Sequence, residues 1–172
     1  MQLLKKFSAF LSIVTSFASC YAQDVTLKEG DIAPDFKLQS DEGKWVQLSD
    51  FKGGNIVLYF YPKNQTSGCT KQACSMRDNL SLITADRTVV LGVSVDNVDS
   101  HKAFKEKEKL NFILLADTAK TVSKQYSGLN AAGMSKRVTF IIDKNGVIKK
   151  IFPKVDVNVH HKEILAVLKE MK

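Results

Sequence analysis

The organisation of the chain is set by residues 56–74, which read Ile-Val-Leu-Tyr-Phe-Tyr-Pro-Lys-Asn-Gln-Thr-Ser-Gly-Cys-Thr-Lys-Gln-Ala-Cys. The first six are apolar or aromatic and end at Pro62, a pattern typical of a strand buried within a sheet. Beyond the proline, side chains suited to a core recur at spacings of four, three and four, at Cys69, Ala73, Met76 and Leu80. The stretch therefore predicts a buried strand and then a helix whose first turn carries an inward-facing Cys69.

Strand patterns recur on both sides of this unit. Residues 36–38 and 45–48 flank a turn and predict an N-terminal hairpin. Two apolar runs, 89–95 and 112–115, are read as further strands. A late hairpin is predicted at Asn145-Gly146, between residues 138–142 and 147–152. Because strands alternate with helices before that hairpin, we expect an α/β sandwich around a mixed central sheet.

Three further helices are predicted from caps and apolar periodicity. Ser100 is placed to cap a helix that runs to about Leu110, whose run of alternating lysines and glutamates is interpreted as a solvated face. Thr118 is placed to cap a short helix that carries Val122 and Tyr126. The last helix is predicted from the apolar stripe Ile164, Leu165, Leu168 and Met171.

Composition narrows the classes of function. The chain has 172 residues, of which 44% are hydrophobic and 25% charged, and this predicts one compact domain with a substantial core. The formal net charge is +7, but there are only three arginines and the lysines are interspersed with acids. A nucleic-acid partner is therefore not expected, since it would favour clustered arginines or a known binding motif.

The first residues resemble an export signal. Lys5 and Lys6 precede an apolar run over residues 7–18 that is short for a membrane span and is followed by small residues. We therefore expect a protein exported to the cell envelope or periplasm.

The end of that signal has two interpretations. Cleavage after Ala22 would make residues 1–22 a signal peptide and 23–172 the mature domain. Alternatively, Ala18-Ser19-Cys20 is a lipoprotein signal, and acylation of Cys20 would attach the protein to a membrane. No other contact with a membrane is expected.

The body of the chain holds one pair of cysteines, Cys69 and Cys74. A helix N-terminus favours thiolate over thiol, so Cys69 is placed to be reactive. Five residues along an ideal helix separate the two Cα atoms by roughly 8.6 Å, whereas a disulfide needs less than about 7 Å. A bond between them requires the helix to unwind, which favours a redox pair, although a structural bridge and inert buried thiols stay open.

The same stretch resembles the active-site motif of the peroxiredoxins, Pro-x-x-x-Thr/Ser-x-x-Cys, at Pro62, Thr66 and Cys69. Within that family it is similar to the bacterioferritin comigratory protein group, also called PrxQ. The features shared with that group are Tyr61-Pro62-Lys63, Cys74 five residues after Cys69, Arg77-Asp78, and residues 30–36 and 137–143.

Two residues depart from the group's pattern. Ser67 stands where the group commonly has proline, which leaves the loop less rigid. Gln72 stands where the group commonly has glutamate, and it cannot hold an arginine by charge.

The resemblance implies a fold, an activity and a cycle. The fold would be a thioredoxin-like three-layer sandwich, with the mixed sheet at its centre and the N-terminal hairpin as an extension. The activity would be reduction of hydrogen peroxide and organic hydroperoxides by thiol chemistry, without a metal or bound cofactor. Cys69 would be the peroxidatic residue, and Cys74 would resolve its sulfenic acid to an intramolecular disulfide that a thioredoxin-like donor reduces. We expect a monomer.

The resemblance also implies roles around the thiol. Thr66 would orient Cys69 and the peroxide, Pro62 would shield the pocket from water, and Arg137 would stabilise the thiolate and the leaving oxygen. Arg77 has two interpretations, an active-site helper or a salt-bridged helix residue.

Two other functions remain open on the sequence. A thioredoxin-like disulfide oxidoreductase of the envelope would normally have two residues between its cysteines, where this chain has four. A non-catalytic metal-binding or interaction module could use the same fold. The histidines, His101, His160 and His161, lack the spacing of a zinc or copper site, so no metal is expected.

Overall fold

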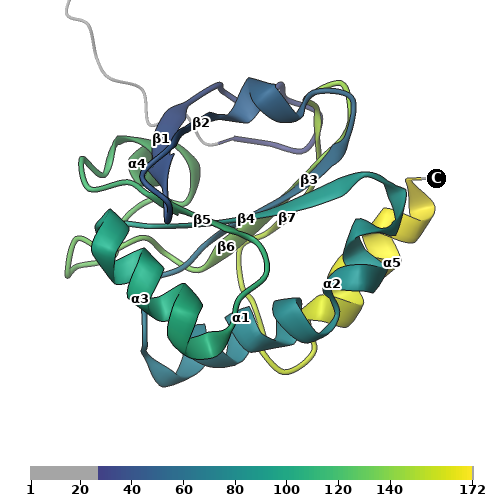
Figure 1. The fold of residues 1–172 in the computed structure, drawn as a ribbon. Coiled ribbons are helices and arrows are strands. Elements are labelled where there is room, and N and C mark those ends of the chain that lie inside the picture. The colour runs from purple at the N-terminus through teal and green to yellow at the C-terminus, as the bar shows by residue number, and fades with distance from the viewer. Residues whose placement is uncertain (1–26, 172) are drawn as a thin grey trace, which may run out of the picture.

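The structure, a computed structural model, describes residues 27–171. The expected signal segment 1–22, with Cys20, lies outside the described residues. Across the described part, one mixed sheet of seven strands forms the centre of the molecule, with helices against both of its faces (Figure 1). This is the predicted three-layer α/β sandwich.

The strand order across the sheet is β2-β1-β5-β4-β3-β6-β7. The strands β3, β4 and β5 are parallel, and the remaining pairings are antiparallel. The predicted N-terminal hairpin, β1 and β2, extends the sheet at the β5 edge, and the predicted late hairpin, β6 and β7, extends it at the β3 edge. The strands are β1 (Lys37–Ser40), β2 (Trp45–Gln47), β3 (Asn55–Phe60), β4 (Thr88–Ser94), β5 (Ile113–Ala116), β6 (Val138–Ile142) and β7 (Ile148–Phe152).

The helices divide unequally between the two faces. Apolar side chains of α1, α2, α3 and α5 share one core cluster on one face of the sheet. Helix α4 packs on the opposite face, near the N-terminal hairpin (Figure 1). Strand β3 serves both clusters, since Leu58 and Phe60 point to one and Val57 and Tyr59 to the other. The helices are α1 (Ser67–Asp78), α2 (Leu80–Ile83), α3 (Val98–Glu108), α4 (Thr121–Tyr126) and α5 (His160–Glu170), and the 3-10 turns are η1 (Leu48–Phe51) and η2 (Thr84–Asp86).

A glycine in β4 makes room for an aromatic ring of β3. Gly92 is the register partner of Tyr59, and a Cβ added at Gly92 would lie 2.7 Å from the Tyr59 phenol oxygen. The space left by the missing side chain lets the Tyr59 ring lie flat over β4 and stack on Tyr61 at a centroid distance of 5.4 Å. The aromatic end of β3 is thereby fixed directly beneath the helix that follows it.

Two predicted helix caps are wrong. The first cap of α3 is Asn97, whose Oδ1 accepts the backbone N–H of Ser100 at 2.9 Å, so the helix begins at Val98 and Ser100 lies inside it. Asparagine caps at least as well as serine, and Asn97 stands three residues before the Ser100 N–H that it accepts. Helix α4 begins at Thr121 rather than after Thr118.

The start of α4 is instead held by a buried carboxylate. Asp117 accepts the backbone N–H of Ser123 through Oδ2 at 2.6 Å, and Lys120 adopts a left-handed conformation with φ of +62° between them. Leu80 also differs from its prediction, because α1 ends at Asp78 and Leu80 opens α2. Val122 and Tyr126 are buried as predicted.

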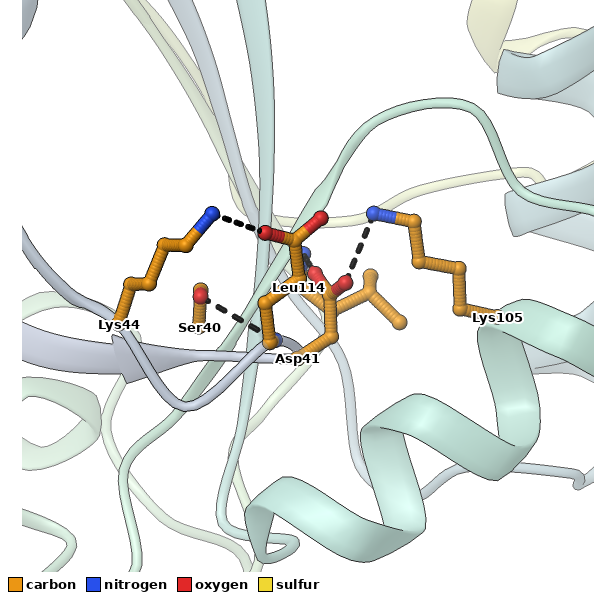
Figure 2. A network of polar contacts seen from close by, with 6 residues as sticks. Ser40, Asp41, Lys44, Lys105 and Leu114 are labelled. Atoms are coloured by element: carbon orange, nitrogen blue, oxygen red, sulfur yellow. Dashed lines mark hydrogen bonds and ion pairs between the residues drawn. The ribbon is translucent and has the colours of Figure 1, made fainter.

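The charged run of α3 is not merely a solvated face. Asp41, only 4% exposed, accepts the backbone N–H of Leu114 and the ammonium of Lys105, each at 2.8 Å (Figure 2). This network joins the β1–β2 turn to β5 and α3. The neighbouring pair Lys44–Glu42 lies at the surface, where an ion pair contributes little.

A second polar network holds the loop between β3 and α1. The Asn64 side chain accepts the Tyr61 hydroxyl at 2.7 Å and donates to the Ser100 hydroxyl at 2.9 Å, and the buried His101 ring nitrogen Nδ1 lies 3.2 Å from both Tyr61 and Asn64. The Asn64 backbone N–H donates to Asp96 at 2.9 Å. The loop that leads to Cys69 is therefore tied to the ends of β4 and α3.

This network gives folding a dependence on pH. Burial lowers the pKa of His101 from 6.5 to about 4, so the folded protein keeps the ring neutral. As the pH falls from about 6.5 to 4, the unfolded chain takes up a proton that the folded chain does not, and stability falls. The full difference corresponds to about 3 kcal/mol.

We expect the His101→Gln variant to show a shallower loss of stability over that pH range than the wild type. Burial also lowers the pKa of His160, so part of the decline persists in the variant. Urea unfolding at a series of pH values measures both profiles. Two parallel profiles would contradict the assignment of the loss to His101.

Candidate active site

Cys69 lies in the first turn of α1, at the carboxyl end of β3. The helix begins after Thr66, whose backbone is extended, and Gln65 before it adopts a left-handed φ of +58° that turns the chain into the helix. Cys69 is the third helical residue and is 2% exposed. Free backbone N–H groups and the positive end of the helix dipole at this position stabilise a thiolate.

Arg137 supplies the cation next to this sulfur. It precedes β6, and the antiparallel pairing of Phe60 with Val138 brings it alongside the end of β3. Its Nη2 donates to the Cys69 Sγ at 3.3 Å. The Cys69 sulfur is thereby in direct contact with a guanidinium, a charge that can stabilise negative charge on the sulfur and on a leaving oxygen.

Gln72 fixes the other arm of the same guanidinium. Its Oε1 accepts Nη1 of Arg137 at 2.6 Å, one helical turn beyond Cys69. The departure at Gln72 therefore leaves a hydrogen bond in place of an ion pair. The amide Nε2 is buried without a hydrogen-bond partner among the described residues.

The motif residues Thr66 and Pro62 lie in the same loop but do not contact the sulfur by hydrogen bonding. The Thr66 hydroxyl is exposed and donates to the Lys63 carbonyl at 3.1 Å, not to Cys69. The role that the family resemblance implies for Thr66, orienting Cys69 and the peroxide, therefore does not rest on a hydrogen bond to Cys69 in this structure. Pro62 lies two residues after the end of β3 and is half-buried, between the buried Tyr61 and the exposed Lys63.

Cys74 lies on the same helix, and both thiols are free. Helix α1 is continuous over Ser67–Asp78, so the Cα atoms of Cys69 and Cys74 are too far apart for a disulfide. No bond can join the two sulfurs in this conformation. Burial raises the pKa of Cys74, and the Glu108 carboxylate, whose Oε2 lies 3.7 Å from its Sγ, raises it further against an opposing effect of Arg77.

Arg77 lies next to Cys74 rather than Cys69. Its Nε pairs with Asp78 at 2.8 Å, and its Nη1 donates to the backbone carbonyl of Glu108. It is 28% exposed. Of the two interpretations, the structure favours a residue that braces the helix, since its polar contacts are with Asp78 and the end of α3.

The sequence reasoning missed several residues around the two sulfurs. The phenol of Tyr59 is buried near Cys69 and has no hydrogen-bond partner within residues 27–171, and burial raises its pKa, so it stays protonated. From α5, His160 contacts the Thr139 hydroxyl at 2.9 Å and His161 contacts the Ser75 hydroxyl at 2.8 Å. No local pattern marks these contacts, because each joins residues from distant parts of the chain.

The histidines have structural partners. Within residues 27–171, no three side chains of His, Cys, Asp or Glu come together in a way that could hold a metal ion. None of the helices in that range is both long and apolar enough to cross a membrane.

Comparisons with known proteins agree with this geometry. The sequence matches the AhpC/TSA family over residues 30–151. A putative peroxiredoxin Bcp of Coxiella burnetii is 43% identical over 148 residues, which cover 82% of this chain and 98% of that protein. The crystal structure of a PrxQ cysteine-to-serine mutant from Xylella fastidiosa superposes with a TM-score of 0.80 at 28% identity, covering 84% of this chain and 97% of that one.

A third comparison concerns the reaction. A structure of the bacterioferritin comigratory protein of Xanthomonas campestris, described for its alkyl peroxide reduction activity, has a TM-score of 0.75 at 28% identity and covers 79% of this chain and 91% of that one. These likenesses favour a peroxidase over the disulfide oxidoreductase and the binding module. The chain belongs to the AhpC/TSA family and is a thiol-dependent peroxidase of the Bcp, or PrxQ, group of peroxiredoxins.

Proposed function

We propose that Cys69 is the peroxidatic residue and that its contact with Arg137 carries the first step. The thiolate attacks one peroxide oxygen, an S–O bond forms and the O–O bond breaks. Cys69 is oxidised to a sulfenic acid, and the other oxygen leaves as water or an alcohol once it is protonated. The observation that supports this step is the 3.3 Å contact between the Arg137 guanidinium and the Cys69 sulfur at a helix N-terminus.

Cys74 then resolves the sulfenic acid within the same chain. Cys74 loses its proton, its thiolate attacks the Cys69 sulfur, an S–S bond forms and the S–O bond breaks, and the hydroxide that leaves takes up a proton to become water. The first turns of α1 must unwind for this step, because the helix holds the two Cα atoms about 8.6 Å apart. A thioredoxin-like donor restores both thiols by exchange with the disulfide.

Thr66 and Pro62 act in this scheme on the peroxide rather than on the resting thiol. The Thr66 hydroxyl is at the exposed lip of the site and can turn toward a bound peroxide by leaving the Lys63 carbonyl. Pro62 limits water next to the loop. The substrates are hydrogen peroxide and organic hydroperoxides, in keeping with the alkyl peroxide activity named for the Xanthomonas protein. The protein works as a monomer, since an intramolecular disulfide needs no second subunit.

The two cysteines are distinguished by the products that their variants accumulate. After one equivalent of hydrogen peroxide, the wild type is expected to form a Cys69–Cys74 disulfide. Cys74→Ser should stop at a sulfenic acid, trapped with a dimedone-type reagent, and Cys69→Ser should consume no peroxide. Intact-mass spectrometry identifies the species. Turnover by Cys69→Ser would overturn the assignment.

Removal of the guanidinium should slow the first step. We expect Arg137→Ala to lower the second-order rate constant for peroxide about a hundredfold, since it deletes a charged donor at the reacting atoms. The matched control is Lys136→Ala, which removes the neighbouring exposed cation that packs on Gly128 instead. Stopped-flow kinetics measures both. Equal losses in the two variants would point to net charge rather than to the contact.

We also propose that the protein is exported to the envelope, by cleavage after Ala22 or as a lipoprotein through Cys20. The composition of residues 1–22 supports this. Cell fractionation, with metabolic labelling by a fatty-acid analogue, tests it. Label on the wild type that is lost in Cys20→Ala indicates the lipoprotein, and unlabelled protein in the periplasm indicates cleavage. Protein confined to the cytosol would contradict export.

A further inference from the structure

One residue at the end of α3 holds the second half of the catalytic helix. The Glu108 carboxylate accepts the Cys74 thiol at 3.7 Å between Sγ and Oε2. The Glu108 backbone carbonyl accepts Nη1 of Arg77, one turn further along α1. Glu108 is therefore bound to α1 at two successive turns on the side that carries Cys74.

The contact matters because Cys74 must change both its position and its protonation state in the proposed cycle. It has to leave α1 to reach Cys69, and it has to lose its proton to act as a nucleophile. In the folded helix, the groups that face it are Arg77 and Asp78 from α1, Glu108 from α3 and the phenol of Tyr59 from β3. Among these, the Glu108 carboxylate is the one in hydrogen-bond contact with the sulfur, and a thiolate there would face its negative charge.

We propose, building on the proposed roles of Cys69 and Cys74, that Glu108 is a positioning residue that restrains the resolving step by keeping Cys74 a thiol on folded α1. Formation of the disulfide requires the S–H···carboxylate contact to break before the Cys74 thiolate attacks the sulfenic acid. The sulfenic acid on Cys69 therefore lives longer than it would without Glu108. A longer-lived sulfenic acid is more exposed to a second peroxide, which oxidises it to sulfinic acid.

The charge of Glu108 can be removed while its backbone contact stays. In Glu108→Gln, the carbonyl that holds Arg77 is kept and the carboxylate beside Cys74 becomes a neutral amide. The pH midpoint of disulfide formation is expected to fall. Below the wild-type midpoint the step should be several-fold faster, up to about tenfold for a shift of one pKa unit. Rapid acid quench after one equivalent of hydrogen peroxide, with intact-mass analysis across pH, measures the rate.

The same samples supply a second readout and the controls. At excess peroxide, Glu108→Gln should accumulate less sulfinic acid than the wild type. Glu106→Gln, an exposed carboxylate on the same helix, should match the wild type in both measurements. The rate of sulfenic acid formation on Cys69 should be the same in all three proteins.

The outcomes separate this inference from the function on which it rests. An unchanged midpoint and rate in Glu108→Gln, with normal sulfenic acid formation, would overturn the role of Glu108 alone. A slower disulfide step in Glu108→Gln would also overturn it, because the carboxylate would then be assisting Cys74 as a base. Absence of both the sulfenic acid and the Cys69–Cys74 disulfide in the wild type would instead overturn the proposed function.

Discussion

The chemistry of the site depends on one contact between residues that are far apart in the chain, the guanidinium of Arg137 against the sulfur of Cys69. Arg137 is in place because β6 pairs antiparallel with β3, which sets it beside the loop that starts α1. The helix N-terminus alone offers only partial charges to a thiolate, worth a fraction of a kcal/mol to about 2 kcal/mol. The full positive charge of Arg137 stabilises a thiolate more strongly than those partial charges. It touches the sulfur directly, and Cys69 is only 2% exposed, so little water screens the interaction.

The surroundings of this contact impose opposite requirements on the two ends of α1. At its start, the Asn64 and His101 network fixes the loop, so Cys69 meets Arg137 in a defined geometry. Toward its end, Cys74 has to move, although Ala73 and Met76 on either side of it are buried in the core. The polar side-chain contacts that join this part of α1 to other helices are with Glu108 on α3 and His161 on α5. Unwinding must therefore release the Cys74 contact with Glu108 locally, while the sheet beneath the helix stays folded.

Local patterns in the sequence were sufficient for most of the fold. The apolar run that became β3, the Asn145-Gly146 turn and the stripe of α5 each depend on neighbours in the chain, and each element formed where it was predicted. The caps of α3 and α4 were misplaced because several residues nearby can cap, and the choice depends on which side chain reaches a free N–H. The alternating charges of α3 were misread for a different reason. Lys105 and Glu108 have partners in the β1–β2 turn and α1, and no spacing within α3 reveals them.

For the site, the two cysteines and Arg137 could be named from the motif, whereas their arrangement needed the structure. Gln72 shows why. From sequence, an amide in place of a carboxylate suggested a weakened hold on an arginine, yet its Oε1 accepts Nη1 of Arg137 at 2.6 Å. The amide orients the guanidinium without neutralising it, so the positive charge next to Nη2 stays available to the sulfur. A carboxylate there would bind Arg137 more tightly, but it would also place a negative charge one helical turn from the thiolate. Gln72 therefore holds the guanidinium less tightly than a carboxylate would, but it leaves the positive charge of Arg137 beside Cys69 without a competing negative charge.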